Sequence, residues 1–160
     1  MPAPDRPENA GLCRHLFHRG HTAGQPVARP DEIVRPYETL GTHPDLVARL
    51  WDEIPALLPV DCRYVLFNAP VLMHPETEIV FGFAGGTHTY ALRLPDHARR
   101  DALAAGATRI KTYPRSPSLD LDVIGPEWVF CGWLAGEDRW CLSAYELAAG
   151  DSIRPCDAQE

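Results

Sequence analysis

Positive charge is scarce in this 160-residue sequence, and lysine is almost absent. Lys111 stands beside fourteen arginines, against 22 aspartates and glutamates, so the formal net charge is −7. A surface that binds nucleic acid or an anionic membrane needs clustered positive charge, which such an acidic chain does not supply. The composition therefore argues against nucleic acid or a membrane as the partner, and it is compatible with a basic protein.

Long apolar segments are also missing. No run approaches the ~20 residues that a membrane-spanning helix needs, and the start of the chain lacks both the charged and the apolar regions of a secretory signal. The cysteines show no CxxC pair and no dense, even-numbered pattern of a disulfide scaffold: Cys13, Cys62, Cys131, Cys141 and Cys156. We therefore expect a cytoplasmic protein with reduced thiols.

Common enzyme signatures are absent as well. The sequence has no GxxxxGK[ST] phosphate loop, no GxGxxG dinucleotide motif, no GxSxG nucleophile elbow and no HExxH zinc motif. Gly85-Gly86 does not form a phosphate loop, because a strand is expected after it where a helix N-terminus would be needed. These absences favour a binding protein over an enzyme.

Proline, by contrast, is abundant, with 16 residues, and it divides the chain. Residues 1–41 hold six prolines and balanced charge, so the excess of acid lies in residues 42–160. Proline at this density opposes regular secondary structure and favours extended segments. We predict a proline-rich N-terminal leader or arm (1–41) that lies against the body or a partner, and one globular domain (42–160).

The globular part begins with a predicted helix. Thr42 offers a capping hydroxyl before Pro44, and the apolar residues that follow share one helical face: Leu46, Val47, Leu50, Trp51 and Ile54. The β-branched and aromatic residues of 63–67 predict a strand. Two prolines in 69–77 predict a loop.

A β-hairpin is predicted around Gly85-Gly86, which would form its two-residue turn between strands 78–84 and 87–94. This turn pairs Phe83 with His88 and Phe81 with Tyr90, and so places the bulky side chains on one face. A shift of one residue would move every side chain to the other face.

The remaining elements complete the predicted fold. A helix runs from Asp96 to Ala105 and ends at Gly106, short strands cover 108–113 and 119–123, the apolar run 128–134 is assigned as a strand, and a last helix covers 138–149. This order predicts a single α+β domain with a mainly antiparallel sheet and a central Gly-Gly hairpin. About three helices flank the sheet and cover one of its faces.

Cys62, His74 and His88 are the candidate catalytic residues. Arg63 could lower the pKa of the adjacent Cys62 thiol, and either histidine could act as its base. This combination would define a cysteine/histidine-dependent hydrolase or transferase. The alternative is a packing thiol at the start of a strand and two partly buried, hydrogen-bonded imidazole rings.

The leader contains a possible zinc site. Its members carry the atoms that zinc prefers: Cys13, His15, His18 and His21. Their spacing matches no standard zinc motif, and the neighbouring arginines Arg14 and Arg19 would repel a cation. The alternative is an amphipathic turn that contacts the body through Leu12, Leu16 and Phe17.

A group of acids after the second helix has two interpretations. Asp120, Asp122 and Glu127 could hold Mg²⁺. They could equally form the solvated face of an edge strand, where charge blocks unwanted pairing. We favour the second interpretation, so zinc in the leader is the one cofactor that remains under consideration.

Aromatic and arginine side chains give the clearest indication of function. The sequence has four tryptophans and five tyrosines, and Trp, Tyr and Arg are frequent anchors of protein interfaces. The candidate binding residues are Trp128, Trp133, Tyr90, Arg93, Arg109 and Arg115. The three arginines, near strand ends, could alternatively bind a small acidic ligand.

One short segment resembles a known family. The helix that starts at Thr42, followed by Leu57-Leu58-Pro59-Val60-Asp61, resembles the start of SUKH-type immunity proteins. The resemblance covers this segment alone, and the later hairpin does not follow their pattern, so no family is assigned. The sequence predicts a small binding protein with a protein partner, as immunity, adaptor or inhibitor proteins have. A cysteine/histidine enzyme and a zinc-binding protein are the alternatives.

Overall fold

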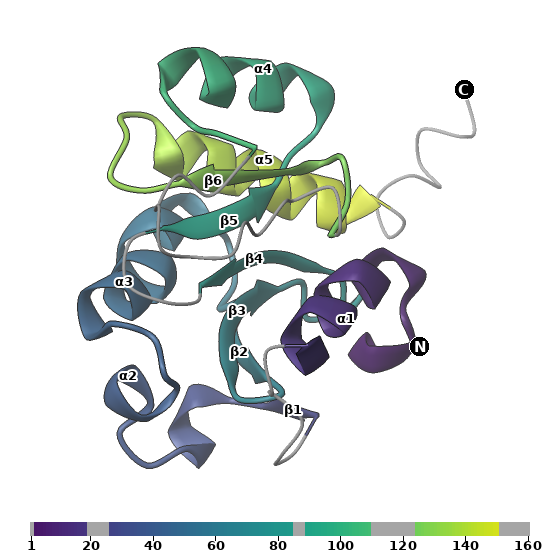
Figure 1. Ribbon diagram of the computed structural model, residues 1–160, viewed down its shortest axis with the longest axis vertical. Coiled ribbons are helices and arrows are strands. Elements are labelled where there is room, and N and C mark those ends of the chain that lie inside the picture. The colour runs from purple at the N-terminus through teal and green to yellow at the C-terminus, as the bar shows by residue number, and fades with distance from the viewer. Residues whose placement is uncertain (1, 19–25, 85–88, 110–123, 151–160) are drawn as a thin grey trace.

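A six-stranded antiparallel sheet forms the centre of the molecule (Figure 1). The computed structural model describes residues 2–18, 26–84, 89–109 and 124–150. Each strand pairs with the next one along the chain. The strands are β1 (Val27–Ala28), β2 (Arg63–Leu66), β3 (Ala69–Met73), β4 (Val80–Ala84), β5 (Tyr90–Arg93) and β6 (Trp128–Cys131). The predicted single α+β domain with an antiparallel sheet is therefore confirmed.

Helices cover both faces of the sheet, so the expectation of one covered face is wrong (Figure 1). The first face carries α1 (Ala10–His18), which follows two short 3₁₀ turns, η1 (Ala3–Asp5) and η2 (Pro7–Asn9). The second face carries three consecutive helical segments with a kink at Pro55, α3 (Pro44–Ala48), η4 (Arg49–Glu53) and η5 (Ile54–Leu57), together with α4 (Asp96–Ala105) and α5 (Glu137–Ala148). Two short elements connect β1 to α3, namely η3 (Pro30–Glu32) and α2 (Pro36–Thr39).

Each face has its own hydrophobic core. The larger core lies between the sheet and the helices of the second face, and it contains all five residues of the predicted stripe: Leu46, Val47, Leu50, Trp51 and Ile54. The smaller core lies under α1 and includes Leu12, Leu16, Phe83 and Trp128. Because both faces are buried, the inner strands are apolar at nearly every position, and alternation does not mark a solvent face.

The described part of the leader is largely helical and packed against the sheet. Nine proline-free residues form α1, so the expected extended conformation is wrong there. Asn9, which is fully buried, fastens this segment to the sheet. Its side-chain amide donates to the carbonyl oxygens of Ala3 (2.8 Å) and Glu78 (2.9 Å), and its Oδ1 accepts from the Val80 N–H (2.9 Å). Phe17 stays half exposed, with its ring edge-to-face on Phe67 at 4.9 Å.

The first tight hairpin joins β2 to β3 rather than β4 to β5. Leu66 pairs with Ala69, and the two residues between them, Phe67 and Asn68, have φ of 47° and 65°. These values are typical of a type I′ turn, whose twist matches that of the strands. The predicted loop over 69–77 is thus wrong for β3. Pro70 is tolerated in this strand because pairing with β4 begins only at Val71, so no partner there needs the missing N–H.

The β4–β5 hairpin exists, but its predicted register is wrong. Phe83 pairs with Ala91 and Ala84 with Tyr90, so the connection is longer than Gly85-Gly86. Phe83 consequently lies in the core under α1, whereas Tyr90 lies in the larger core on the other face. A bulge between Leu72 and Met73 also turns Phe81 into that larger core.

The later elements agree closely with the predictions. Helix α4 covers Asp96–Ala105 and is capped by Gly106 at φ 121°, and β6 confirms the strand assigned to the apolar run 128–134 for its first four residues, 128–131. Helix α3 begins where expected, but its cap is His43, whose ring Nδ1 accepts from the Asp45 N–H, rather than Thr42. Thr108 forms a single bridge to Phe130. The predicted strand 119–123 and residues 110–113 lie outside the described residues.

The four cysteines within the described segments are all buried and free of disulfide bonds: Cys13, Cys62, Cys131 and Cys141. Burial raises the pKa of each of these thiols, which keeps them protonated at neutral pH. Of the helices in the described parts of the chain, none has the length and apolar character needed to cross a membrane.

Candidate functional site

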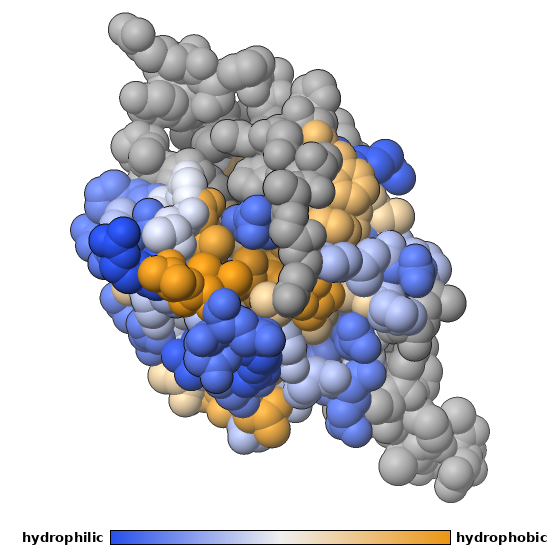
Figure 2. All heavy atoms as spheres, turned by 90° about the horizontal axis from the view of Figure 1, so that it is seen from below, coloured by the Kyte–Doolittle hydropathy of each residue, from blue (hydrophilic) through white to orange (hydrophobic). Residues whose placement is uncertain are grey.

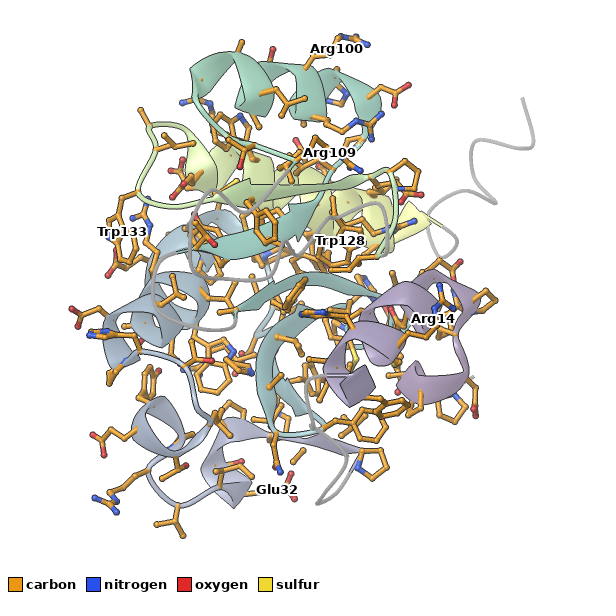
Figure 3. All side chains as sticks on the ribbon, viewed as in Figure 1. Arg14, Glu32, Arg100, Arg109, Trp128 and Trp133 are labelled. Carbon is orange, nitrogen blue, oxygen red and sulfur yellow. The ribbon has the colours of Figure 1, made fainter. Side chains whose placement is uncertain are left out.

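Trp133 is the most exposed tryptophan of the described residues and stands in the short connection between β6 and α5. Its side chain keeps 51 % of its surface open to solvent, whereas the other three tryptophans are buried. Its backbone has φ of 53°, a left-handed conformation that costs a non-glycine residue roughly 1–2 kcal/mol. Figure 3 shows the indole at the margin of the molecule, pointing away from the sheet. The fold therefore presents a large aromatic ring to solvent in a strained backbone conformation.

A buried ion pair lies beneath this connection. Glu137, the first residue of α5, has a fully buried carboxylate, and Arg49 of η4 binds it through Nε (3.1 Å) and Nη2 (2.6 Å). The second carboxylate oxygen of Glu137 accepts from the Leu134 N–H at 2.9 Å. The Arg49 guanidinium carbon lies 6.0 Å from the centre of the Trp133 ring, at the limit of a cation–π contact. Glu137 thus fixes both the connection and the cation beside the indole.

Tyr90 extends this polar group into the sheet. Burial, together with the negative charge of Glu137, raises the pKa of Tyr90, so its hydroxyl stays neutral. That hydroxyl is buried beside the Glu137 carboxylate, although the two groups are not in good hydrogen-bond geometry. Tyr90 therefore adds a polar group to the buried side of the Arg49–Glu137 pair.

The surface around Trp133 carries charged groups of both signs. Arg49 also pairs with the half-exposed Glu53 (3.0 Å), so one guanidinium lies between two carboxylates. Burial lowers the pKa of Arg49, but its hydrogen bonds to Glu137 and Glu53 outweigh this and raise the pKa overall. At the start of α5, Asp138 adds a negative group and the exposed Arg139 a positive one. The group formed by Trp133, Arg49, Glu53, Glu137 and Asp138 is called the Trp133 platform below.

The other predicted binding residues do not join this platform as surface groups. Trp128 and Tyr90 are each 1 % exposed and belong to the two cores. Arg109 donates through Nη1 to the carbonyl oxygens of Pro126 and Trp128, both at 2.7 Å, next to the bridge that Thr108 forms with β6. Arg93 lies on the α1 face at the end of β5. Arg115 lies outside the described residues.

Cys62 directly precedes β2 and His74 directly follows β3, but the two residues lack the properties of a nucleophile and base. Cys62 is buried, and burial with the nearby Asp61 carboxylate raises the pKa of its thiol to about 12. A nucleophilic cysteine needs the opposite shift. His74 is also buried, and its Nδ1 accepts two backbone N–H groups, from Glu76 (3.1 Å) and Thr77 (3.2 Å). His88 lies outside the described residues. The arrangement supplies no observation in favour of cysteine/histidine catalysis.

His74 instead holds the β3–β4 connection in its neutral form, which makes stability depend on pH. Burial lowers the pKa of His74 below its ordinary value of 6.5, partly offset by the Glu76 charge. His74 therefore binds a proton more readily in the unfolded chain than in the folded chain. Its contribution to stability is complete above pH 6.5 and falls as the pH drops below that value.

We expect His74→Asn to remove this part of the pH dependence, because an Asn Oδ1 can accept the same two N–H groups without titrating. Urea unfolding of both proteins at pH 7.5 and pH 5.0 measures the difference. Wild type should lose stability on acidification relative to His74→Asn, and parallel losses would contradict the role of His74.

The predicted zinc ligands are not brought together by the described residues. Cys13 and His15 both lie on α1 and are buried, but His15 packs its ring against Phe83 at 5.8 Å. No group of three or more His, Cys, Asp or Glu side chains in the described segments has the geometry to hold a metal ion. The side chain of His18 and the whole of His21 are outside the description, as are Asp120 and Asp122, so zinc and Mg²⁺ binding stay untested.

A second charged surface surrounds a cleft of about 340 Å³ beside η3 and α2. Its two arginines are already occupied: Arg29 pairs with Asp61 at 3.0 Å and lies over the Tyr64 ring, and Arg63 pairs with Asp61 and Asp52. Figure 2, which views the molecule from this side, shows apolar patches divided by charged groups. Because both arginines are paired within the chain, neither guanidinium group of this cleft is available to a ligand.

Sequence reasoning singled out Trp133 but missed its support. Arg49 and Glu137 are 88 positions apart in the sequence, and neither stands in a motif. The one available signal was the acid at the start of the last helix, which the helix dipole explains on its own. Comparison of the chain with protein-family models, curated proteins and solved structures finds no match.

Proposed function

We propose that the protein works by binding another protein through the Trp133 platform. The observation that supports this is the indole itself, half exposed on a backbone with φ of 53° and placed beside a guanidinium that a buried carboxylate holds still. Strain at an exposed residue gives the fold no stability, and such strain is concentrated at functional positions. Trp and Arg are also the residue types that contribute most to protein interfaces.

The partner should be basic. The platform includes the carboxylates of Glu53 and Asp138, and the whole chain carries a net charge of −7. A lysine or arginine of the partner could lie against the open part of the Trp133 ring while its charge faces these carboxylates. This is the chemistry by which a small adaptor or inhibitor protein recognises a cationic surface.

Replacement of Trp133 by glycine separates binding from folding. Glycine adopts positive φ without strain, so the free energy of unfolding should stay within about 1 kcal/mol of wild type. Binding of the partner should weaken about 30-fold or more, as for a central interface tryptophan. The matched control is Leu103→Ala, which removes another exposed apolar side chain, on α4, and should leave binding unchanged.

The experiment is affinity capture from the native host with wild type, Trp133→Gly and Leu103→Ala, followed by titration of the purified captured protein. The proposal requires a basic protein that wild type and Leu103→Ala retain, that Trp133→Gly loses, and whose affinity falls as salt rises. Equal capture by Trp133→Gly, or no protein enriched by wild type, would refute it.

A further inference from the structure

A second cleft, of about 380 Å³, lies on the α1 side of the sheet, separate from the Trp133 platform. One wall is the face of α1 formed by Ala10, Gly11 and Arg14, which share a side of the helix by their i, i+1, i+4 spacing. The other wall is the segment 124–127 that leads into β6, and Arg93 closes the cleft from the end of β5. A volume of this size suits a small molecule.

The two walls are held in close contact by a glycine. A Cβ atom at Gly11 would lie 2.2 Å from the Ile124 carbonyl oxygen, so any side chain there would force α1 away from the 124–127 segment. The width of the cleft is therefore set by backbone packing rather than by the side chains that line it. A cleft fixed in this way is preformed, which lowers the cost of binding a ligand.

Two arginines face this cleft without a partner of their own. Most described arginines are occupied by carboxylates or carbonyl oxygens, as Arg49, Arg63 and Arg109 are. Neither the Arg14 side chain nor the Arg93 side chain has a hydrogen bond or an ion pair with any residue in the described segments. The side chains of Arg100 and Arg139 are unpaired as well, but among the described arginines without a partner only Arg14 and Arg93 line a common cleft, where one anion could contact both.

The carboxylates that line the cleft do not pair with Arg14 or Arg93. Glu8 is 3.4 Å from Arg6 and is compensated by it. Glu127 lines the cleft but forms no ion pair with a described arginine. With the Arg6–Glu8 pair neutral, Arg14, Arg93 and Glu127 leave one net positive charge on the walls. That charge suits a single anionic group.

We infer that this cleft binds a small molecule through a carboxylate or phosphate group, held between the guanidinium groups of Arg14 and Arg93. The planar guanidinium fork matches two oxygens of either anion. Arg93 was already a candidate for a small acidic ligand from its place in the sequence. Arg14 is the second contact, and it comes from a segment far away in the chain.

The test is a titration of the full chain with sodium phosphate and with sodium acetate, at constant ionic strength and followed by amide NMR shifts. We expect saturable shifts at Gly11 and at residues 124–127 for at least one probe, and the tighter probe identifies the anionic group. Arg14→Gln and Arg93→Gln should each weaken binding about tenfold or more, since a hydrogen bond to a charged group is lost. Arg93→Lys, which keeps the charge but not the fork, should give an intermediate loss.

Two further variants distinguish a specific site from general ionic effects. Arg100→Gln removes another exposed arginine, on α4 away from the cleft (Figure 3), and should leave affinity unchanged. Glu127→Gln removes a repulsive charge and should tighten anion binding severalfold, which a purely structural role would not predict. No saturable shift with either probe, or equal weakening in Arg100→Gln and Arg93→Gln, would overturn the inference.

Discussion

Replacing Arg49 by methionine should lower the free energy of unfolding by about 3–5 kcal/mol, the largest effect that we expect from one substitution in this chain. The loss does not come from the value of the ion pair itself. It comes from Glu137, whose carboxylate is fully buried and receives two guanidinium nitrogens at 3.1 and 2.6 Å. Without Arg49, that charge keeps one backbone N–H and no cation among its described contacts.

The origin of the loss can be tested in the same chain. Adding Glu137→Gln to Arg49→Met removes the stranded charge and keeps an oxygen for the Leu134 N–H, so most of the lost stability should return. Glu53→Gln is the matched control, because the Arg49–Glu53 pair is half exposed and worth at most about 1 kcal/mol. Urea unfolding of wild type and the three variants provides the measurement. A loss below 1 kcal/mol for Arg49→Met, or no recovery in the double variant, would contradict this account.

Arg49 also links stability to the proposed function. The guanidinium that neutralises Glu137 is the one that lies beside the Trp133 ring. Arg49→Met/Glu137→Gln should therefore fold well, yet present the indole without its fixed cation. If the platform binds as proposed, this double variant separates the contribution of the cation from that of the ring.

The helices of the second face were predictable because each has a solvent side. The apolar stripe from Leu46 to Ile54 recurs with a helical period, and all five of its members are buried. Helix α4 ends at Gly106, as a glycine after an amphipathic segment indicates. In these segments, the side of the helix that the sequence marks as apolar is the side that packs against the core.

The register of the sheet could not be predicted in the same way. Every residue of β3 and of β4 is buried, because α1 covers the face that was expected to be open. Alternation then carries no information, and a register three residues away satisfies burial equally well. The turn at Phe67-Asn68 also lacks the glycine that usually marks such hairpins.

Residue type alone does not tell which of the aromatic candidates lies at the surface. Trp128, Trp133 and Tyr90 are equivalent as aromatic candidates in the sequence, but two of them are core residues and one is exposed. What separates them is the backbone conformation after β6 and the ion pair that supports it. Both depend on contacts between segments that are far apart in the chain.

The attachment of α1, which creates one wall of the anion cleft, depends on Asn9. Asn9→Ala removes a side chain that donates to the carbonyl oxygens of Ala3 and Glu78 and accepts from the Val80 N–H, all within 2.9 Å. Because Asn9 is fully buried, water cannot replace it without moving the segment. We expect a loss of about 3 kcal/mol in the free energy of unfolding, since several buried backbone groups lose their partners together.

Hydrogen exchange identifies where that loss falls. In Asn9→Ala the amides of α1 should exchange faster than in wild type, while those of α5 should follow only the global change in stability. Thr39→Ala is the matched control: its hydroxyl shares its one proton between the carbonyl oxygens of Val34 (2.9 Å) and Arg35 (3.1 Å), but at an exposed site where the cost should stay at about 0.5 kcal/mol. Unchanged exchange in α1, or equal losses in the two variants, would show that apolar contacts alone hold the leader on the sheet. The predicted pattern would instead mean that one buried amide fixes α1, and with it the distance between Arg14 and Arg93.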